Sequence, residues 1–152
     1  MIKATIFNLN LISGHSSVVE RLVANEKVEG STPFARSKLY MNDLLNKKCV
    51  PCEGGVLPFD ISEIHKYQKK VDGWNISQNK KEIFFLNKKF IFKNFLESQN
   101  FINKVGQISE SEGHHPDILF GWGYAEIKIT THAIQGLSEN DFILAAKIDQ
   151  IN

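Results

Sequence analysis

The sequence predicts an α+β domain in which a four-stranded antiparallel sheet carries three helices on one face. Two observations lead to this prediction. Segments with helix-start signals are separated by pairs of short segments that are rich in Ile and Phe or that alternate apolar and polar residues, in the order helix-strand-strand-helix-strand-strand-helix. Tight turns join the strands of each pair, which makes them antiparallel and gathers the helices on one face.

The length, composition and net charge of the chain limit the classes of protein to which it can belong. Its 152 residues are enough for one domain with a single core, and 42% hydrophobic with 23% charged residues is ordinary for a soluble globular protein. A formal net charge of +1 gives no basic field for nucleic acid or an anionic membrane, and the apolar runs are far too short to span a bilayer. We therefore expect a protein that binds neither nucleic acid nor membrane. Its two cysteines cannot form a disulfide framework, which favours a reduced, cytoplasmic setting.

Residues 1–40 are expected to lie outside the domain as a non-native or disordered leader. Codons for residues 16–20 and 30–33 can spell the D-arm and the T-loop of a transfer RNA gene, and the fourteen codons between their starts match the separation of those arms. The alternative is a short helix with one apolar stripe. We interpret the segment as a translated tRNA gene that precedes a start at Met41, with the domain at 41–152; coding DNA that cannot form a cloverleaf would contradict this.

A C-x-x-C pair, Cys49 and Cys52, follows the expected start. Two cysteines cannot form a disulfide framework, a structural zinc site would need two more ligands, and no βαβ context supports a thioredoxin-like site. We interpret the pair as part of a plain N-terminal arm, with a metal site as the alternative.

Capping signals mark the three helices. Each expected start has a Ser, Asp or Asn followed three residues later by a carboxylate, and glycines suit the ends of the first two helices. The capping residues are Asp60, Asn94 and Ser138, and the glycines are Gly73 and Gly113.

The second helix is expected to bury one apolar face against the sheet. Phe101 falls off that face, so we expect it to be a subunit contact or a partly buried edge residue. The residues of the expected face are Phe92 or Phe95, Leu96, Gln99, Ile102, Val105 and Gly106.

Strands are expected at 74–76, 82–92, 118–122 and 125–132. A bulge or local turn is expected at 87–89, within the second of them. The alternation of the fourth strand places its final residue, a histidine, on the polar or edge-exposed face.

Three of the five histidines lie close together in the chain. They are His114, His115 and His132, and the imidazole pKa nearest neutrality makes them natural proton carriers. Pro116 disfavours helix at His115, so the adjacent pair sits at the junction between a helix end and a strand, where function concentrates.

Structural alternatives exist for these residues. His114 would suit the C-terminal end of a helix, and Asp141 would complete a capping box with Ser138. Glu110 is a solvated carboxylate in the last helical turn or, since that end is negative, a partner of His114. Three histidines would also suit a metal, although adjacent residues rarely point at one ion.

The spacing of the whole segment resembles that of the pterin-4a-carbinolamine dehydratase family. The matching residues are Glu110, His114, His115, Pro116, Trp122, His132 and Asp141. The resemblance extends back through Trp74 and more loosely to Cys49, over about the last two-thirds of the chain. It implies an α+β domain that associates into homodimers or homotetramers through sheet edges and helices.

By this resemblance the protein is a hydro-lyase. It would remove water from 4a-hydroxytetrahydropterin to give quinonoid dihydropterin, recycling the cofactor of aromatic amino acid hydroxylases with neither a metal nor an organic cofactor. The alternative is a non-catalytic dimerisation, assembly or transcriptional coactivator module of the same fold, which would not need the histidines.

The resemblance also assigns residues. Catalysis would fall to His114, His115 and His132; the rest of the pocket would comprise Gly113, Pro116, Trp122, Thr130 and Thr131, with Glu110 and Asp141 as supports. Gly113 stands where many members have Asp, and Asn140 where some have Arg. The loss of the carboxylate at position 113 would alter how the histidine pair is oriented. Because Pro116 holds His115 extended, we expect its ring to point away from that of His114.

Overall fold

The computed structural model describes residues 43–51 and 57–151, so the expected leader at 1–40, the start at Met41 and Cys52 lie outside it. The elements follow the expected order, with a short 3-10 helix, η1, before the last helix. They are α3 (Ile61–Gln68), β1 (Asn75–Gln78), β2 (Phe84–Ile91), α4 (Phe95–Glu112), β3 (Asp117–Gly121), β4 (Tyr124–Ile129), η1 (His132–Ile134) and α5 (Glu139–Ile148).

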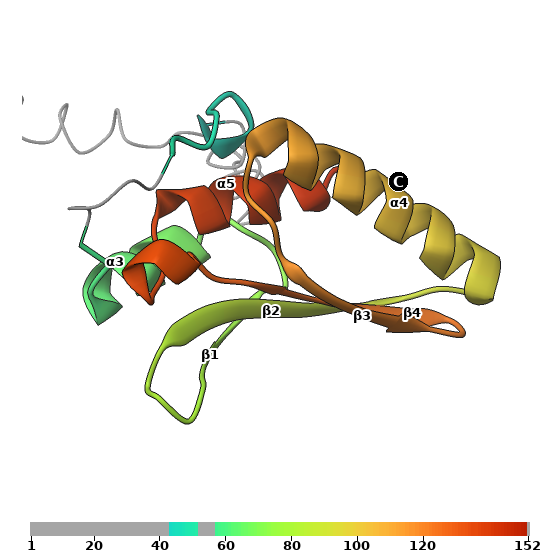
Figure 1. The fold of residues 1–152 in the computed structure, drawn as a ribbon, viewed down its shortest axis with the longest axis horizontal. Helices are drawn as coiled ribbons and strands as arrows, with labels where there is room; N and C mark the ends of the chain where they lie inside the picture. Colours follow the sequence, from blue (N-terminus) through green and yellow to red (C-terminus); the bar gives the residue numbers. More distant parts are fainter. Residues whose placement is uncertain (1–42, 52–56, 152) are drawn as a thin grey trace, which may run out of the picture. The chain divides into compact units, whose positions relative to one another are not determined.

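The four strands form one sheet in the order β1-β2-β4-β3, and every neighbouring pair is antiparallel. The three helices lie together on one face of this sheet (Figure 1). The predicted fold class is therefore confirmed. No helix in the described ranges has the length and apolar character needed to cross a membrane.

The core lies between the sheet and the three helices. In β4, Ala125, Ile127 and Ile129 are buried while the residues between them are partly exposed, as the alternation predicts. Eight of the ten residues of α5 are buried, which is typical of a helix covered on nearly all sides. The start of α5 is thus held firmly beside the end of β4.

The expected helix caps form. Asp60 accepts a hydrogen bond from the Glu63 amide at 2.8 Å, and Asn94 accepts one from the Glu97 amide at 2.9 Å. The first helix ends earlier than predicted. α3 ends at Gln68, and hydrogen-bonded turns fill the interval to Gly73.

The buried face of α4 differs from the expected one. Leu96 is 61% exposed, whereas Phe101 is only 6% exposed and its ring centroid lies 4.5 Å and 5.1 Å from those of Phe90 and Phe92. The buried residues of α4 are Ser98, Phe101, Val105 and Ser109. The expectation for Phe101 was wrong, and that for Val105 was right.

Two serines account for the error in the helix face. Ser98 donates a hydrogen bond to the carbonyl of Gly121 at 2.7 Å, and Ser109 donates one to the carbonyl of Val105 at 2.8 Å. A hydroxyl that is satisfied on a backbone carbonyl can be buried at little cost. The apolar pattern therefore misplaced the face by about one residue position.

The bulge or turn expected at 87–89 does not form. β2 runs without interruption, and these residues pair in register with β4. Lys88 points to the covered side, where its Nζ lies 2.7 Å from Asp149 Oδ1. Burial raises the pKa of Asp149, although the hydrogen bonds from Lys88 and the Trp74 indole oppose this. A buried partner thus lets a lysine stand inside a strand.

We predict that Phe101→Ala lowers the free energy of unfolding by about 3–5 kcal/mol, because it removes a buried ring from an aromatic cluster. Asn103→Ala, at an exposed position of the same helix, is the control and should cost about 0.5 kcal/mol or less. Urea unfolding followed by circular dichroism measures both. Equal losses would contradict the observed helix face.

Candidate functional site

A pocket of about 360 Å³ lies where the end of α4, the end of β4 and the start of α5 meet. It brings together residues that are far apart in the sequence. Six expected site residues line it: Gly113, His114, His115, Thr130, Thr131 and His132.

The other four expected residues do not line this pocket. Asp141 and Glu110 are instead hydrogen-bond partners of the adjacent histidines. Pro116 follows the histidine pair and leads into β3. Trp122 is 72% exposed in the turn at the far end of β3. The structure thus keeps Trp122 apart from the pocket residues.

The end of α4 fixes the backbone of His114. Gly113 has φ 63°, its amide donates to the carbonyl of Glu110, and the His114 amide donates to the carbonyl of Ser109. These two bonds form a Schellman motif, which reverses the chain directly into His114. Asp also tolerates this left-handed conformation better than most residues, so glycine in place of Asp does not require a different backbone here.

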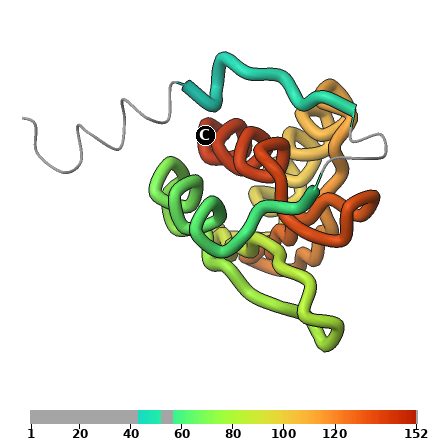
Figure 2. The backbone as a smooth tube through the Cα atoms, turned by 90° about the vertical axis from the view of Figure 1, so that its left-hand side faces the viewer, coloured from blue at the N-terminus to red at the C-terminus, as the bar shows by residue number. Residues whose placement is uncertain are grey.

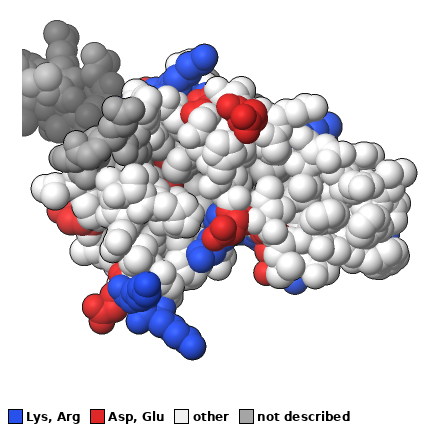
Figure 3. All heavy atoms as spheres, viewed as in Figure 1, with Lys and Arg blue, Asp and Glu red and all other residues white. Residues whose placement is uncertain are grey.

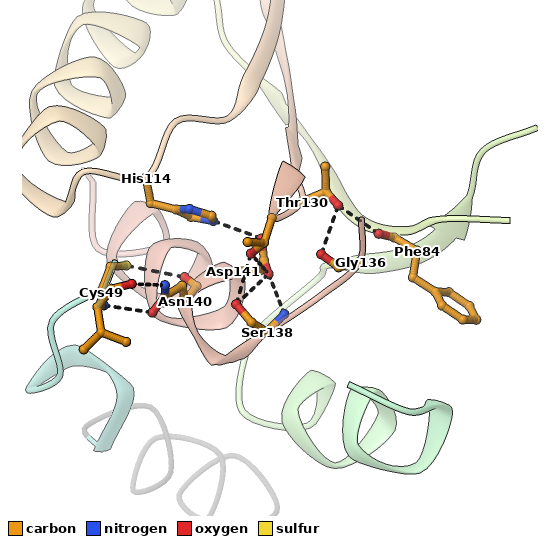
Figure 4. Close-up of polar contacts among 10 residues, drawn as sticks. Cys49, Phe84, His114, Thr130, Gly136, Ser138, Asn140 and Asp141 are labelled. Carbon is orange, nitrogen blue, oxygen red and sulfur yellow. Dashed lines mark hydrogen bonds and ion pairs between the residues drawn. The ribbon is translucent and has the colours of Figure 1, made fainter. Parts of the chain in front are cut away.

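His114 is paired with a buried carboxylate. Its Nε2 lies 2.9 Å from Asp141 Oδ1, and the His114 and Asp141 residues are 9% and 0% exposed (Figure 4). The other oxygen, Oδ2, accepts bonds from Thr131 Oγ1 at 2.8 Å and from the Ser138 amide at 2.7 Å. One oxygen of Asp141 thus completes the expected capping box of α5, and the other lies against the imidazole of His114.

This pairing has a chemical consequence for the ring. An ionised carboxylate only accepts, so the hydrogen of a neutral His114 is on Nε2, toward Asp141. The lone pair is then on Nδ1, and the hydrogen bond to Asp141 fixes the orientation of the ring. A buried carboxylate behind an imidazole is the usual arrangement for a histidine that accepts a proton.

His115 has a different environment. Its Nε2 lies 2.9 Å from Glu110 Oε2, and the two side chains are 62% and 82% exposed. Glu110 is therefore the partner of His115 rather than of His114. The two adjacent rings have partners on different elements, in line with the expectation that they diverge. An ion pair this exposed contributes little to stability.

The alternation predicted that His132 ends the fourth strand, but β4 stops before it, at Ile129. The Thr130 hydroxyl lies within hydrogen-bond distance of the carbonyls of Phe84 and Gly136, and Thr131 pairs with Gly136 across a short loop. His132 begins η1 within that loop and is exposed at the pocket.

An N-terminal segment, the arm Asp43–Pro51, supplies pocket residues that sequence reasoning missed. Cys49, Val50 and Pro51 line the pocket, together with Glu112 and Asn140. Figure 2 shows the arm passing α5 and reaching the end of α4. The C-x-x-C motif drew attention to this segment, but only a contact across some ninety residues of sequence places it here.

Charged and ionisable groups around the arm are paired or neutral. Burial raises the pKa of the Cys49 thiol to about 12, so it stays protonated near neutral pH. Burial also opposes ionisation of Glu112, but hydrogen bonds from Lys147 and the Cys49 amide outweigh it and lower the pKa of Glu112. Among the described residues, no three His, Cys, Asp or Glu side chains are grouped as a metal site requires.

We predict that Asp141→Ala lowers the free energy of unfolding by about 2–4 kcal/mol, because it leaves His114, Thr131 and the Ser138 amide without their buried acceptor. Asp141→Asn keeps one acceptor oxygen and should lose less. Asp60→Ala removes an exposed capping carboxylate with no histidine partner and is the control for capping alone. Thermal unfolding compares the three; equal losses for Asp141→Ala and Asp60→Ala would contradict a role for the buried cluster.

Comparison with known proteins identifies the family of this domain. The family model described as pterin 4 alpha carbinolamine dehydratase matches residues 58–151. Relatives from Halorhodospira halophila and Rubrobacter xylanophilus, which carry the provisional name pterin-4-alpha-carbinolamine dehydratase, are 46% and 44% identical over 108 and 111 residues, or 71% and 73% of this chain and 96% and 100% of theirs. A solved structure described as a transcriptional coactivator/pterin dehydratase from Brucella melitensis has a TM-score of 0.55 at 23% identity, over 60% of this chain and 95% of its own, and shows the same fold. With the model covering more than half of the chain and relatives this similar, the chain belongs to the pterin 4 alpha carbinolamine dehydratase family.

Proposed function

We propose that the protein dehydrates 4a-hydroxytetrahydropterin to quinonoid dihydropterin by histidine acid–base catalysis. One observation carries the proposal: three histidines from two separate elements line one pocket, and a buried carboxylate holds one of them. The family supplies the substrate class, and the pocket supplies proton carriers where a pterin ring would lie. Recycling of the cofactor of aromatic amino acid hydroxylases would then be the metabolic role.

The reaction requires two proton transfers. The C4a–O bond breaks and the hydroxyl leaves as water with a proton from an acid, while a base removes the proton on N5 and an N5–C4a double bond forms. Each properly placed general acid or base typically contributes about 100- to 10,000-fold to the rate.

The geometry supports a division of labour. His114 is oriented by Asp141 with its lone pair on Nδ1, which suits the base. His132 reaches the pocket from a different element, so the two can flank one substrate, and His132 would be the acid. His115 is turned toward Glu110 at the surface and would mainly position the pterin ring.

We predict that His132→Ala and His114→Ala each lower kcat by about 100-fold or more, because each removes one of the two proton carriers. His65→Ala, an exposed histidine on α3, is the matched control and should leave kcat unchanged. The measurement is the loss of 4a-hydroxytetrahydropterin in a stopped-flow assay. Wild-type protein that fails to accelerate this loss would favour the non-catalytic module.

His115→Ala should instead raise KM more than it lowers kcat, since the loss of a group that only positions the substrate leaves the chemical step intact. The same assay measures both constants. If His115→Ala gave the largest loss of kcat with an unchanged KM, the division of labour would be wrong.

We further propose that the protein forms homodimers or homotetramers through the apolar surface at one end of the sheet. β3 is an edge strand, and the exposed apolar side chains around it and the start of α4 are Ile91, Phe95, Leu96, Leu119 and Trp122. Figure 3 shows mostly neutral side chains at this end. A second copy would cover both the open strand edge and the apolar surface.

Substituting Leu96 and Leu119 together by Lys should shift the oligomer toward monomer, because two charges would be buried at the interface. Leu57→Lys, at an 83% exposed leucine outside this surface, is the control. Light scattering at micromolar concentration measures the mass of each. A wild-type monomer, or a double variant that assembles like the wild type, would contradict the proposal.

A further inference from the structure

The arm Asp43–Pro51 precedes the segment that the family model matches, which begins at residue 58. It nevertheless forms one side of the pocket, because three of its residues, Cys49, Val50 and Pro51, line it. These three residues are additional to the histidines and threonines that the sequence assigned to the site.

Asn140 forms two hydrogen bonds with the backbone of the arm. The Val50 amide donates to Asn140 Oδ1 at 3.1 Å, and Asn140 Nδ2 donates to the Val50 carbonyl at 2.7 Å. One side-chain amide therefore bonds both backbone groups of a single pocket residue, as a neighbouring strand would. Asn140 is only 5% exposed, whereas Val50 is 67% exposed, so these bonds run from a buried side chain to a residue at the surface.

Two further contacts hold the same segment. The Cys49 amide donates to Glu112 Oε2 at 3.0 Å, and Lys47 Nζ lies 2.6 Å from Glu139 Oε1. Glu112 lies two residues before His114, and Asn140 directly precedes Asp141. The two elements that position the buried His114–Asp141 pair thus also fasten the arm.

We propose that the arm is a fixed wall of the substrate pocket and that Asn140 is the positioning residue that sets ligand affinity through it. The identity of the ligand rests on the proposed function. Val50 and Pro51 offer the pocket aliphatic surface without charge, which suits contact with the face of a flat heteroaromatic ring. The Cys49 thiol remains neutral, so the wall supplies no proton carrier near neutral pH. The arm therefore acts on binding and leaves the proton transfers to the histidines.

Asn140→Ala tests the proposal in the full chain. It should raise KM for the carbinolamine about 10-fold while kcat stays within about twofold, because it loosens a binding wall and spares the proton carriers. Asn94→Ala is the matched control, since it removes another hydrogen-bonding asparagine, the N-cap of α4, at the far end of that helix. It should lower the melting temperature and leave KM unchanged. A KM for Asn140→Ala equal to that of the wild type would overturn the proposal.

Val50→Trp keeps the test valid if Asn140→Ala folds poorly. Val50 is 67% exposed, so a larger side chain does not disturb the core, but it does narrow the pocket. We expect a higher KM with nearly unchanged kcat and melting temperature. An unchanged KM would count against the arm as a pocket wall.

Amide hydrogen exchange separates this proposal from the dehydratase assignment. The non-reacting pterin 7,8-dihydrobiopterin should slow exchange at Cys49 and Val50 in the wild type, and Asn140→Ala should speed exchange there and abolish the ligand effect. Protection of the arm without any turnover would sink the dehydratase assignment and support the wall. Turnover by the wild type without protection of the arm would sink the wall and leave the dehydratase assignment in place.

Discussion

The Asp141 carboxylate joins three parts of the chain at one buried point. Through Oδ1 it holds the His114 ring at the end of α4, and through Oδ2 it accepts from Thr131 and from the Ser138 amide at the start of α5. Because an ionised carboxylate without partners is costly to bury, this arrangement persists only while all three parts are in place. The same carboxylate therefore caps α5 and orients the imidazole.

The ends of α4 and α5 form the frame of the site, and the other pocket elements attach to that frame. The Schellman motif at Gly113 delivers His114, while the loop closed by Thr131 and Gly136 delivers His132. The arm reaches the same frame through Glu112 and Asn140. A helix end and a short closed loop thus carry the groups proposed to move protons, and the arm, outside the range that the family model matches, carries the wall proposed to set affinity.

Local signals predicted what depends on local chemistry. Caps at Asp60 and Asn94, the glycine at the end of α4 and the alternation in β4 all appeared as expected, since backbone hydrogen bonds and side-chain period act over a few residues. The predictions failed where a distant partner changed the balance. Lys88 is accommodated within β2 because Asp149 pairs with it. Phe101 is buried because it packs against the ring of Phe90.

The sequence by itself determined the α+β order of elements, the cluster of histidines near the end of α4 and the spacing that resembles one family, because periodicity, capping and motif spacing are written along the chain. Only the tertiary structure decided which carboxylate serves which histidine. It gave Asp141 to His114 and Glu110 to His115, left Trp122 at the far end of β3, and brought the arm across to Asn140. Such pairings depend on which helix ends and strands meet in space, and a local sequence pattern does not specify which of them meet.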